Sequence, residues 1–137
     1  MDGQIAALTT DSEFKNGDYI SAPIKGVEAF SVVWSGWLYS QEWWRRELWK
    51  EKSPDKSVTQ RLIETKDLFK GLDANNLIAQ ARTWQIHDIG TTEGFDGNIE
   101  KAIGSIQVPV LYMPSVSDLY FPIGDAQYEA SFNKNIQ

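Results

Sequence analysis

The sequence has 137 residues, a formal net charge of −6, one histidine and no cysteine. The length suits one ordinary domain, and the acidic balance argues against a nucleic-acid partner, because phosphate binding needs clustered Lys and Arg. No apolar run approaches the roughly 20 residues that span a bilayer, so we expect a cytoplasmic protein with no membrane partner.

The first two thirds of the chain are predicted to be helical. The expected segments, in chain order, are the end of a core helix over 1–9, a loop over 9–22, a helix opened by Pro23, a helix from Ser57 to Phe69 that ends at Gly71, and a helix capped by Asp73. Apolar residues recur at helical spacing from Val27 to Leu48, and Gly36 predicts a break near 36–40. We therefore read 10–97 as a helical layer.

Residues 98–137 are predicted to form a helix–strand–helix unit. Asn98 can cap a short helix, the apolar run 108–113 is typical of a buried strand, and Pro122 can open the last helix. A single strand leaves its backbone donors and acceptors without partners. We therefore expect an α/β fold that is completed by the rest of a longer protein or by a complementing chain.

Asp118 is the candidate catalytic residue. It follows the predicted strand 108–113, and open α/β sheets place functional residues in loops that leave the carboxyl ends of strands. Aspartate is also favoured in such loops for Asx-turns and helix caps, so a purely structural role is the alternative. The nearby serines, Ser115 and Ser117, have no base at a recognisable spacing.

Four of the six tryptophans fall between residues 34 and 44. Large rings bury much apolar area at low entropic cost. This bias indicates either a substrate pocket or packing between helices, and the candidate pocket residues are Trp34, Trp37, Trp44 and Trp84.

His87 is the only histidine. No second histidine, no cysteine and no metal-ligand spacing accompanies it. We therefore predict no metal site and interpret His87 as a polar residue near a helix end.

Two segments resemble a known family. The segment 71–85, with its Asp-Ala-Asn start and Arg-Thr-Trp-Gln end, looks like a lid helix, and 109–122 is similar to a strand and loop that bear a catalytic acid. Both resemble the homoserine O-acetyltransferase-like proteins of the α/β-hydrolase superfamily. The resemblance implies a partial α/β-hydrolase fold: the end of a core helix (1–9), a helical lid (10–97) and a C-terminal piece of the core (98–137).

The resemblance makes Asp118 the acid of a Ser-Asp-His triad, in which it accepts the imidazole Nδ1–H. The family order is serine, acid, histidine, whereas this sequence has no G-x-S-x-G and His87 precedes Asp118. We therefore expect a C-terminal-half fragment that lacks the nucleophile elbow and the catalytic histidine and is inactive alone.

The function implied by the resemblance is acyl transfer. The intact enzyme would pass an acyl group from acetyl-CoA or another acyl-CoA to an alcohol through an acyl-serine, with no bound cofactor. Homoserine is not expected as the acceptor, because the arginine that such members carry is missing near Phe30. Two alternative functions stay open: an esterase of a secondary-metabolite pathway that acts on a small-molecule ester, and a non-catalytic helical interaction module with a Trp-rich surface. Whether the chain forms a dimer also stays open.

Overall fold

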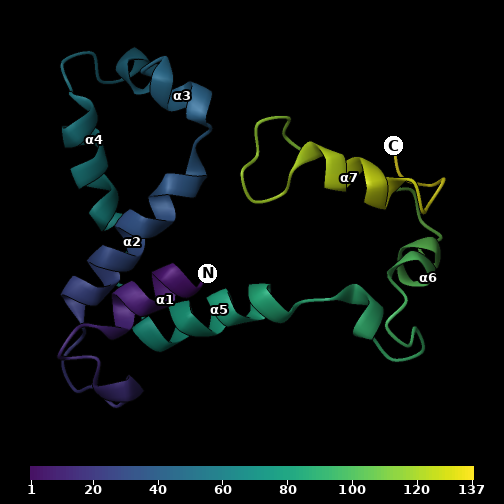
Figure 1. Cartoon of the computed structure of the whole chain (residues 1–137), viewed down its shortest axis with the longest axis horizontal. Helices are drawn as coiled ribbons and strands as arrows, with labels where there is room; N and C mark the ends of the chain where they lie inside the picture. Colours follow the sequence, from purple (N-terminus) through teal and green to yellow (C-terminus); the bar gives the residue numbers. More distant parts are fainter. The chain divides into compact units, whose positions relative to one another are not determined.

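The computed structural model describes all 137 residues as two compact units, Met1–Ile86 and His87–Gln137. Figure 1 shows their helices in chain order along the colour bar. The first unit contains α1 (Asp2–Thr9), η1 (Lys15–Gly17), α2 (Ile24–Leu38), α3 (Gln41–Arg45), η2 (Leu48–Glu51), α4 (Val58–Glu64), η3 (Thr65–Asp67) and α5 (Ala74–Ile86). The second contains η4 (Ile89–Thr91), α6 (Ile99–Gly104) and α7 (Ile123–Ala130). None of these helices is long and apolar enough to cross a membrane.

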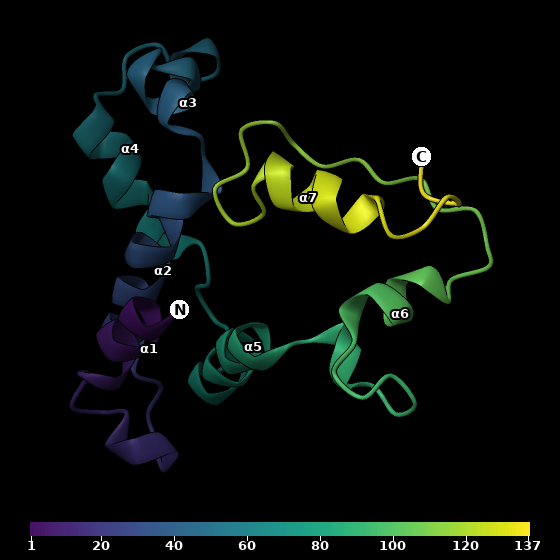
Figure 2. The same ribbon diagram turned by 45° about the vertical axis from the view of Figure 1, so that its right-hand side comes forward.

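The first unit is organised around α2. Helix α1 packs along α2, as both views show (Figures 1 and 2), and it also contacts α5. The buried apolar side chains of these three helices form the core of the unit: Leu8, Val27, Phe30, Leu77 and Ala81. Full burial of a leucine or phenylalanine contributes about 1.5–3 kcal/mol, so the burial of these side chains stabilises the unit.

Helices α1 and α2 approach each other closely at Gly26. A Cβ atom at this position would lie 2.5 Å from the carbonyl oxygen of Leu8 and 2.9 Å from Cβ of Asp11. Only glycine lets two backbones come this near. The position of Gly26 in the sequence therefore fixes where the two helices cross.

The N-terminus of α2 is capped by a residue outside the helix. Its N-cap residue, Pro23, makes no side-chain hydrogen bond. Instead Asp11 accepts the N–H of Gly26 at 2.8 Å through Oδ2 and the N–H of Glu13 at 3.0 Å through Oδ1. The bonds from Glu13 and Gly26, in that order of size, hold the pKa of Asp11 below its usual value. Asp11 thus does what an N-cap side chain normally does.

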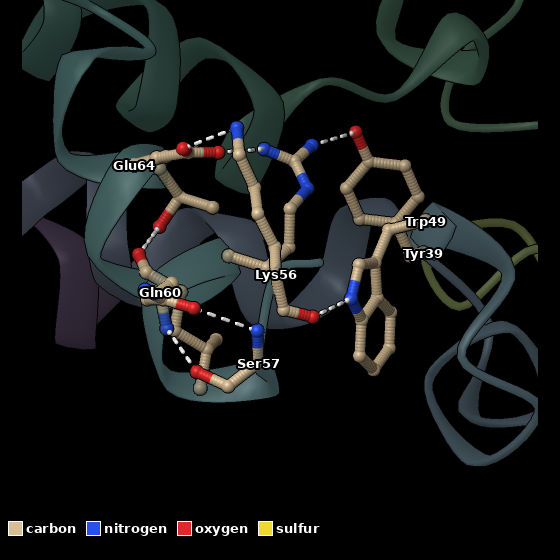
Figure 3. Close-up of polar contacts among 9 residues, drawn as sticks. Tyr39, Trp49, Lys56, Ser57, Gln60 and Glu64 are labelled. Carbon is tan, nitrogen blue, oxygen red and sulfur yellow. Dashed lines mark hydrogen bonds and ion pairs between the residues drawn. The ribbon is translucent and has the colours of Figure 1, made fainter. Parts of the chain in front are cut away.

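Three other helices begin at residues that the sequence marks as caps. Ser57 and Gln60 form a capping box at the start of α4 (Figure 3). Asp73 accepts the backbone N–H three residues later at 2.9 Å, and Asn98 does the same at 2.8 Å. The caps predicted at Asp73 and Asn98 are therefore confirmed.

The break predicted near 36–40 is also confirmed, because α2 ends at Leu38. The helix predicted from Ser57 to Phe69 is wrong in its length: α4 ends at Glu64 and continues only as the short η3. The hydroxyl of Thr65 donates to the carbonyl of the residue three before it at 2.6 Å. Such a bond competes with the hydrogen-bond ladder of the helix.

The strand predicted over 108–113 is not formed as a strand. A single parallel bridge joins Val110 to Ile136. The N–H of Val110 donates to the carbonyl of Asn135 at 2.9 Å, and the N–H of Gln137 donates back to the carbonyl of Val110 at 3.0 Å. The apolar run does not build a core either, since Leu111 is 73% exposed. The physical reason is that only the short segment 135–137 pairs with it.

Helix α7 connects the two paired segments. An extended segment, a helix and a second extended segment paired in parallel make the arrangement of a βαβ unit. The buried amide of Asn133 holds the end of this unit against α6, because it donates to the carbonyls of Ile103 and Ile106 at 2.7 and 2.8 Å. The chain is thus mostly helical, and its α/β character lies in this one unit. The predicted roles of 1–9, 10–97 and 98–137 stay a prediction.

Replacing Gly26 by alanine is expected to lower the free energy of unfolding by roughly 1–3 kcal/mol, because the backbone of α1 has to move. Gly36→Ala is the matched control in the same helix, where an added Cβ meets nothing within 4 Å. It is expected to gain about 0.5–1 kcal/mol from helix propensity. Urea unfolding measures both, and an unchanged stability of Gly26→Ala would contradict the close approach.

Replacing Asp11 by alanine is expected to cost about 0.5–2 kcal/mol at neutral pH, as the loss of a cap does. Because the pKa of Asp11 is lowered in the folded state, its contribution is present above the unfolded pKa and is lost as the pH falls through the lower folded pKa. The difference in Tm between wild type and variant should therefore shrink in acid. Asp55→Ala, an exposed change in the same unit, is the control; a pH-independent difference for Asp11→Ala argues against the cap.

Candidate functional site

Asp118 lies in the loop between the extended segment 109–113 and α7. Its Oδ1 accepts the backbone N–H of Tyr120 at 2.8 Å and that of Phe121 at 3.0 Å. This is the Asx-turn that the sequence offered as the structural alternative. The carboxylate is half-buried and follows a segment paired in parallel, so the turn and the position expected of a catalytic acid occur together.

The chemistry open to this carboxylate is that of a hydrogen-bond acceptor. Two backbone N–H groups fix the orientation of Oδ1 without neutralising the charge. A carboxylate oriented in this way can accept the N–H of an imidazole, fix its tautomer and stabilise the imidazolium that forms. Asp118 as the triad acid stays a prediction.

Tyr120 is the titratable neighbour of Asp118. Burial, and after it the negative charge of Asp118, raises the pKa of Tyr120 to about 12. The phenol therefore remains neutral far above neutral pH and does not compete as an anion with the carboxylate. His87, the only histidine, is exposed and lies between α5 and η4.

The four tryptophans predicted to line a pocket divide into two groups within the first unit. In the first group Trp34 is buried and lies 5.5 Å from the ring of Trp84, which comes from α5. Trp34 also stacks on Phe30 of the same helix at 5.4 Å and meets the ring of Phe69 edge-on at 5.5 Å, so it packs α2 against α5 and the segment that contains Phe69. Trp37 and Trp84 are 50% and 42% exposed, and the role of the group in a pocket stays a prediction.

Trp44 belongs to the second group, which we name the α3 aromatic cluster: Tyr39, Trp43, Trp44 and Trp49. Tyr39 and Trp43 stack with ring centroids 3.9 Å apart and planes at 12°. Trp44 meets Trp43 edge-on at 4.9 Å. Trp49 is only 5% exposed, and its indole N–H donates to the carbonyl of Lys56 at 3.1 Å (Figure 3).

The first unit also has pockets that were not predicted, and two of them differ in their lining. One, of about 560 Å³, lies beside the α3 aromatic cluster and includes Lys56, Arg61 and Glu64 in its lining. No local pattern shows that Arg61 contacts Tyr39, because 22 residues separate them. The other, of about 480 Å³, is lined mainly by apolar residues of the loop before α2, of α2 and of the loop before α5.

Tyr19 closes one side of the apolar pocket. Its hydroxyl donates to the carboxylate of Asp73 and accepts the N–H of Ala74 at 3.1 Å. The carboxylate hydrogen bond lowers the pKa of Asp73, and desolvation followed by that bond raises the pKa of Tyr19. Asp73, which caps α5, is thus bound to a loop residue more than fifty positions away. The capping role of Asp73 has a signal in the sequence, whereas its contact with Tyr19 has none.

The chain is similar to ester hydrolases. It is 30% identical over 135 residues to the ethyl acetate hydrolase of Pseudomonas veronii, which covers 96% of this chain and 38% of that protein. It is 27% identical over 124 residues to a Corynebacterium glutamicum protein described as a probable esterase, covering 89% of this chain and 35% of that protein. The chain therefore spans somewhat more than a third of the length of these curated relatives. No family model matches it.

Solved structures give the same picture. An acetylester hydrolase from Corynebacterium glutamicum matches with a TM-score of 0.88 and 25% identity, and the acetyl esterase MekB with 0.87 and 28%; each comparison covers 98% of this chain and 39% of the other. A homoserine O-acetyltransferase from Bacillus anthracis matches with a TM-score of 0.74 and 20% identity over 96% of this chain and 37% of that one. These neighbours are consistent with an α/β-hydrolase relationship. They favour the esterase alternative over acyl transfer, since the transferase likeness concerns the fold alone.

The Asx-turn makes a prediction about the loop. Asp118→Ala removes the acceptor of two N–H groups, each worth about 0.5–1.5 kcal/mol. The amides of Tyr120 and Phe121 are therefore expected to exchange with deuterium about 2- to 10-fold faster. Asp118→Asn retains an oxygen acceptor and is expected to keep wild-type exchange. Equal exchange in wild type and Asp118→Ala would show that the turn does not depend on this side chain.

Proposed function

We propose that this chain is part of an ester hydrolase of the α/β-hydrolase type that acts on acetyl and other short-chain esters, with Asp118 as the acid of its triad. The observation that carries the proposal is the likeness of 98% of the chain to two acetylester hydrolases. The position of Asp118 supports the proposal. The residue follows an extended segment that pairs in parallel with the segment after α7, and its carboxylate is held by an Asx-turn. The activity of the whole protein is part of this proposal.

The proposed reaction proceeds through an acyl-serine. A serine attacks the ester carbonyl, a histidine takes the serine proton and passes it to the leaving alcohol, and water then releases the acid. Asp118 accepts the imidazole Nδ1–H and stabilises the imidazolium. The serine and the histidine are not assigned to residues of this chain.

The helices of 10–97 take the part of a lid in this proposal. Among the predicted pocket residues, Trp37 and Trp84 are 50% and 42% exposed and are the candidates for contact with the substrate. A lid that excludes water favours acyl transfer, whereas hydrolysis requires that water reach the acyl-serine. The proposal therefore includes a lid that admits water.

A chimera tests this function. The part of the Pseudomonas veronii ethyl acetate hydrolase that aligns with this chain is replaced by the chain, and ethyl acetate hydrolysis is measured. We expect a hydrolase that does not use acetyl-CoA, and an Asp118→Asn chimera with kcat lower by roughly 10⁴-fold, as for other triad acids. Asp118→Asn keeps the acceptor of the Asx-turn, so the loss reports the charge and not the loop.

Asp125→Asn, an exposed change at the start of α7, is the matched control and should retain activity. The isolated chain should show no turnover. A folded chimera in which Asp118→Asn remains as active as its parent would rule out Asp118 as the triad acid. Acetyl transfer from acetyl-CoA in place of hydrolysis would restore the transferase alternative.

A further inference from the structure

The pocket of about 560 Å³ beside the α3 aromatic cluster has three aromatic side chains in its lining, those of Tyr39, Trp43 and Trp49. The rings of Tyr39 and Trp43 stack on each other with their centroids 3.9 Å apart. Trp49 is fixed by its N–H bond to the backbone carbonyl of Lys56 at 3.1 Å (Figure 3). Rings that are already held in place bind a flat apolar ligand with little further loss of entropy.

Cations lie beside these rings. The guanidinium carbon of Arg61 is 5.6 Å from the ring centroid of Tyr39, and its Nη2 donates to the Tyr39 hydroxyl at 2.9 Å. Figure 3 shows Lys56 beside the carboxylate of Glu64, and Arg61 forms an ion pair with the same carboxylate. The distances are 2.5 Å from Lys56 Nζ and 3.7 Å from Arg61 Nη1. The single carboxylate of Glu64 therefore forms ion pairs with both cations, Lys56 and Arg61.

The remaining charged residues of the lining are Glu51 and Lys52, which offset each other. The pocket thus has three cations and two carboxylates in a chain whose formal net charge is −6. This local excess of positive charge opposes the charge of the molecule as a whole. It favours an anion over a neutral or cationic ligand.

We propose that this pocket binds a small aromatic carboxylate, with its ring along the Tyr39–Trp43 stack and its carboxylate toward Lys56 and Arg61. Lys56 and Arg61 together carry one more positive charge than the Glu64 carboxylate that they share, and this charge attracts the carboxylate of the ligand. The site uses only residues of the first unit and no residue of the proposed triad, so it goes beyond the proposed hydrolase function.

Calorimetric titration of the 137-residue chain tests the proposal, with 2-naphthoate as the probe and 2-naphthol as its neutral counterpart. At low salt the anion is expected to bind about tenfold more tightly than the alcohol, and added salt should reduce this ratio. Equal affinity for the two probes would overturn the proposal. So would binding of the alcohol alone.

Charge variants locate the effect. Lys56→Gln keeps the backbone carbonyl that holds Trp49, and it should weaken naphthoate binding about 5- to 10-fold with naphthol unchanged. Glu64→Gln should strengthen naphthoate binding by a similar factor. Lys66→Gln, whose Nζ lies 3.9 Å from Glu28 outside the lining, makes the same change in net charge and should alter nothing.

Each variant is checked by its unfolding transition before titration. If Lys56→Gln does not fold, Glu64→Gln decides the question, because it acts in the opposite direction and a gain in affinity does not follow from damage. Unchanged naphthoate affinity in Glu64→Gln, or equal effects of Lys56→Gln and Lys66→Gln, would overturn the assignment.

Discussion

The parallel pairing of Val110 with Ile136 is the constraint on which the candidate site depends. Because α7 runs between the two paired segments, the loop that contains Asp118 has to leave from the carboxyl end of the first one. The loop then orients the carboxylate with its own backbone N–H groups. The backbone of the loop therefore sets the orientation of the carboxylate, and burial beside it raises the pKa of Tyr120 to about 12.

The predictable parts of the fold are those that depend on residues close together in the sequence. Asp73 and Asn98 cap helices by bonds that span three positions, and such spacing is visible in a sequence. The bond from Gly26 to Asp11 spans fifteen positions and has no local pattern. The position of Asp118 after the predicted strand made it a candidate, and the α/β-hydrolase resemblance supplied its role as a triad acid, because an aspartate in a loop is by itself an ordinary turn residue.

Two expectations were not resolved by the sequence for physical reasons. An apolar run such as 108–113 shows that a segment suits a sheet, but the number of partners beside it is a property of the tertiary structure. Helical spacing and the break predicted near 36–40 left open where Trp44 lies relative to Trp34, because α2 ends at Leu38 between them. After that break Trp44 contacts Trp43 and Trp49. Trp34 and Trp44 therefore belong to different clusters.

The cap of α2 has a consequence for the order in which the first unit becomes structured. Helices α4 and α5 begin at their own capping residues, Ser57 and Asp73. The first turn of α2, the longest helix, is capped only when Asp11, two residues beyond the end of α1, has docked against Gly26. Nucleation of a helix is unfavourable without such help. Helices α1 and α2 should therefore open and close as a single foldon, because a residue that follows α1 limits the fraying of α2.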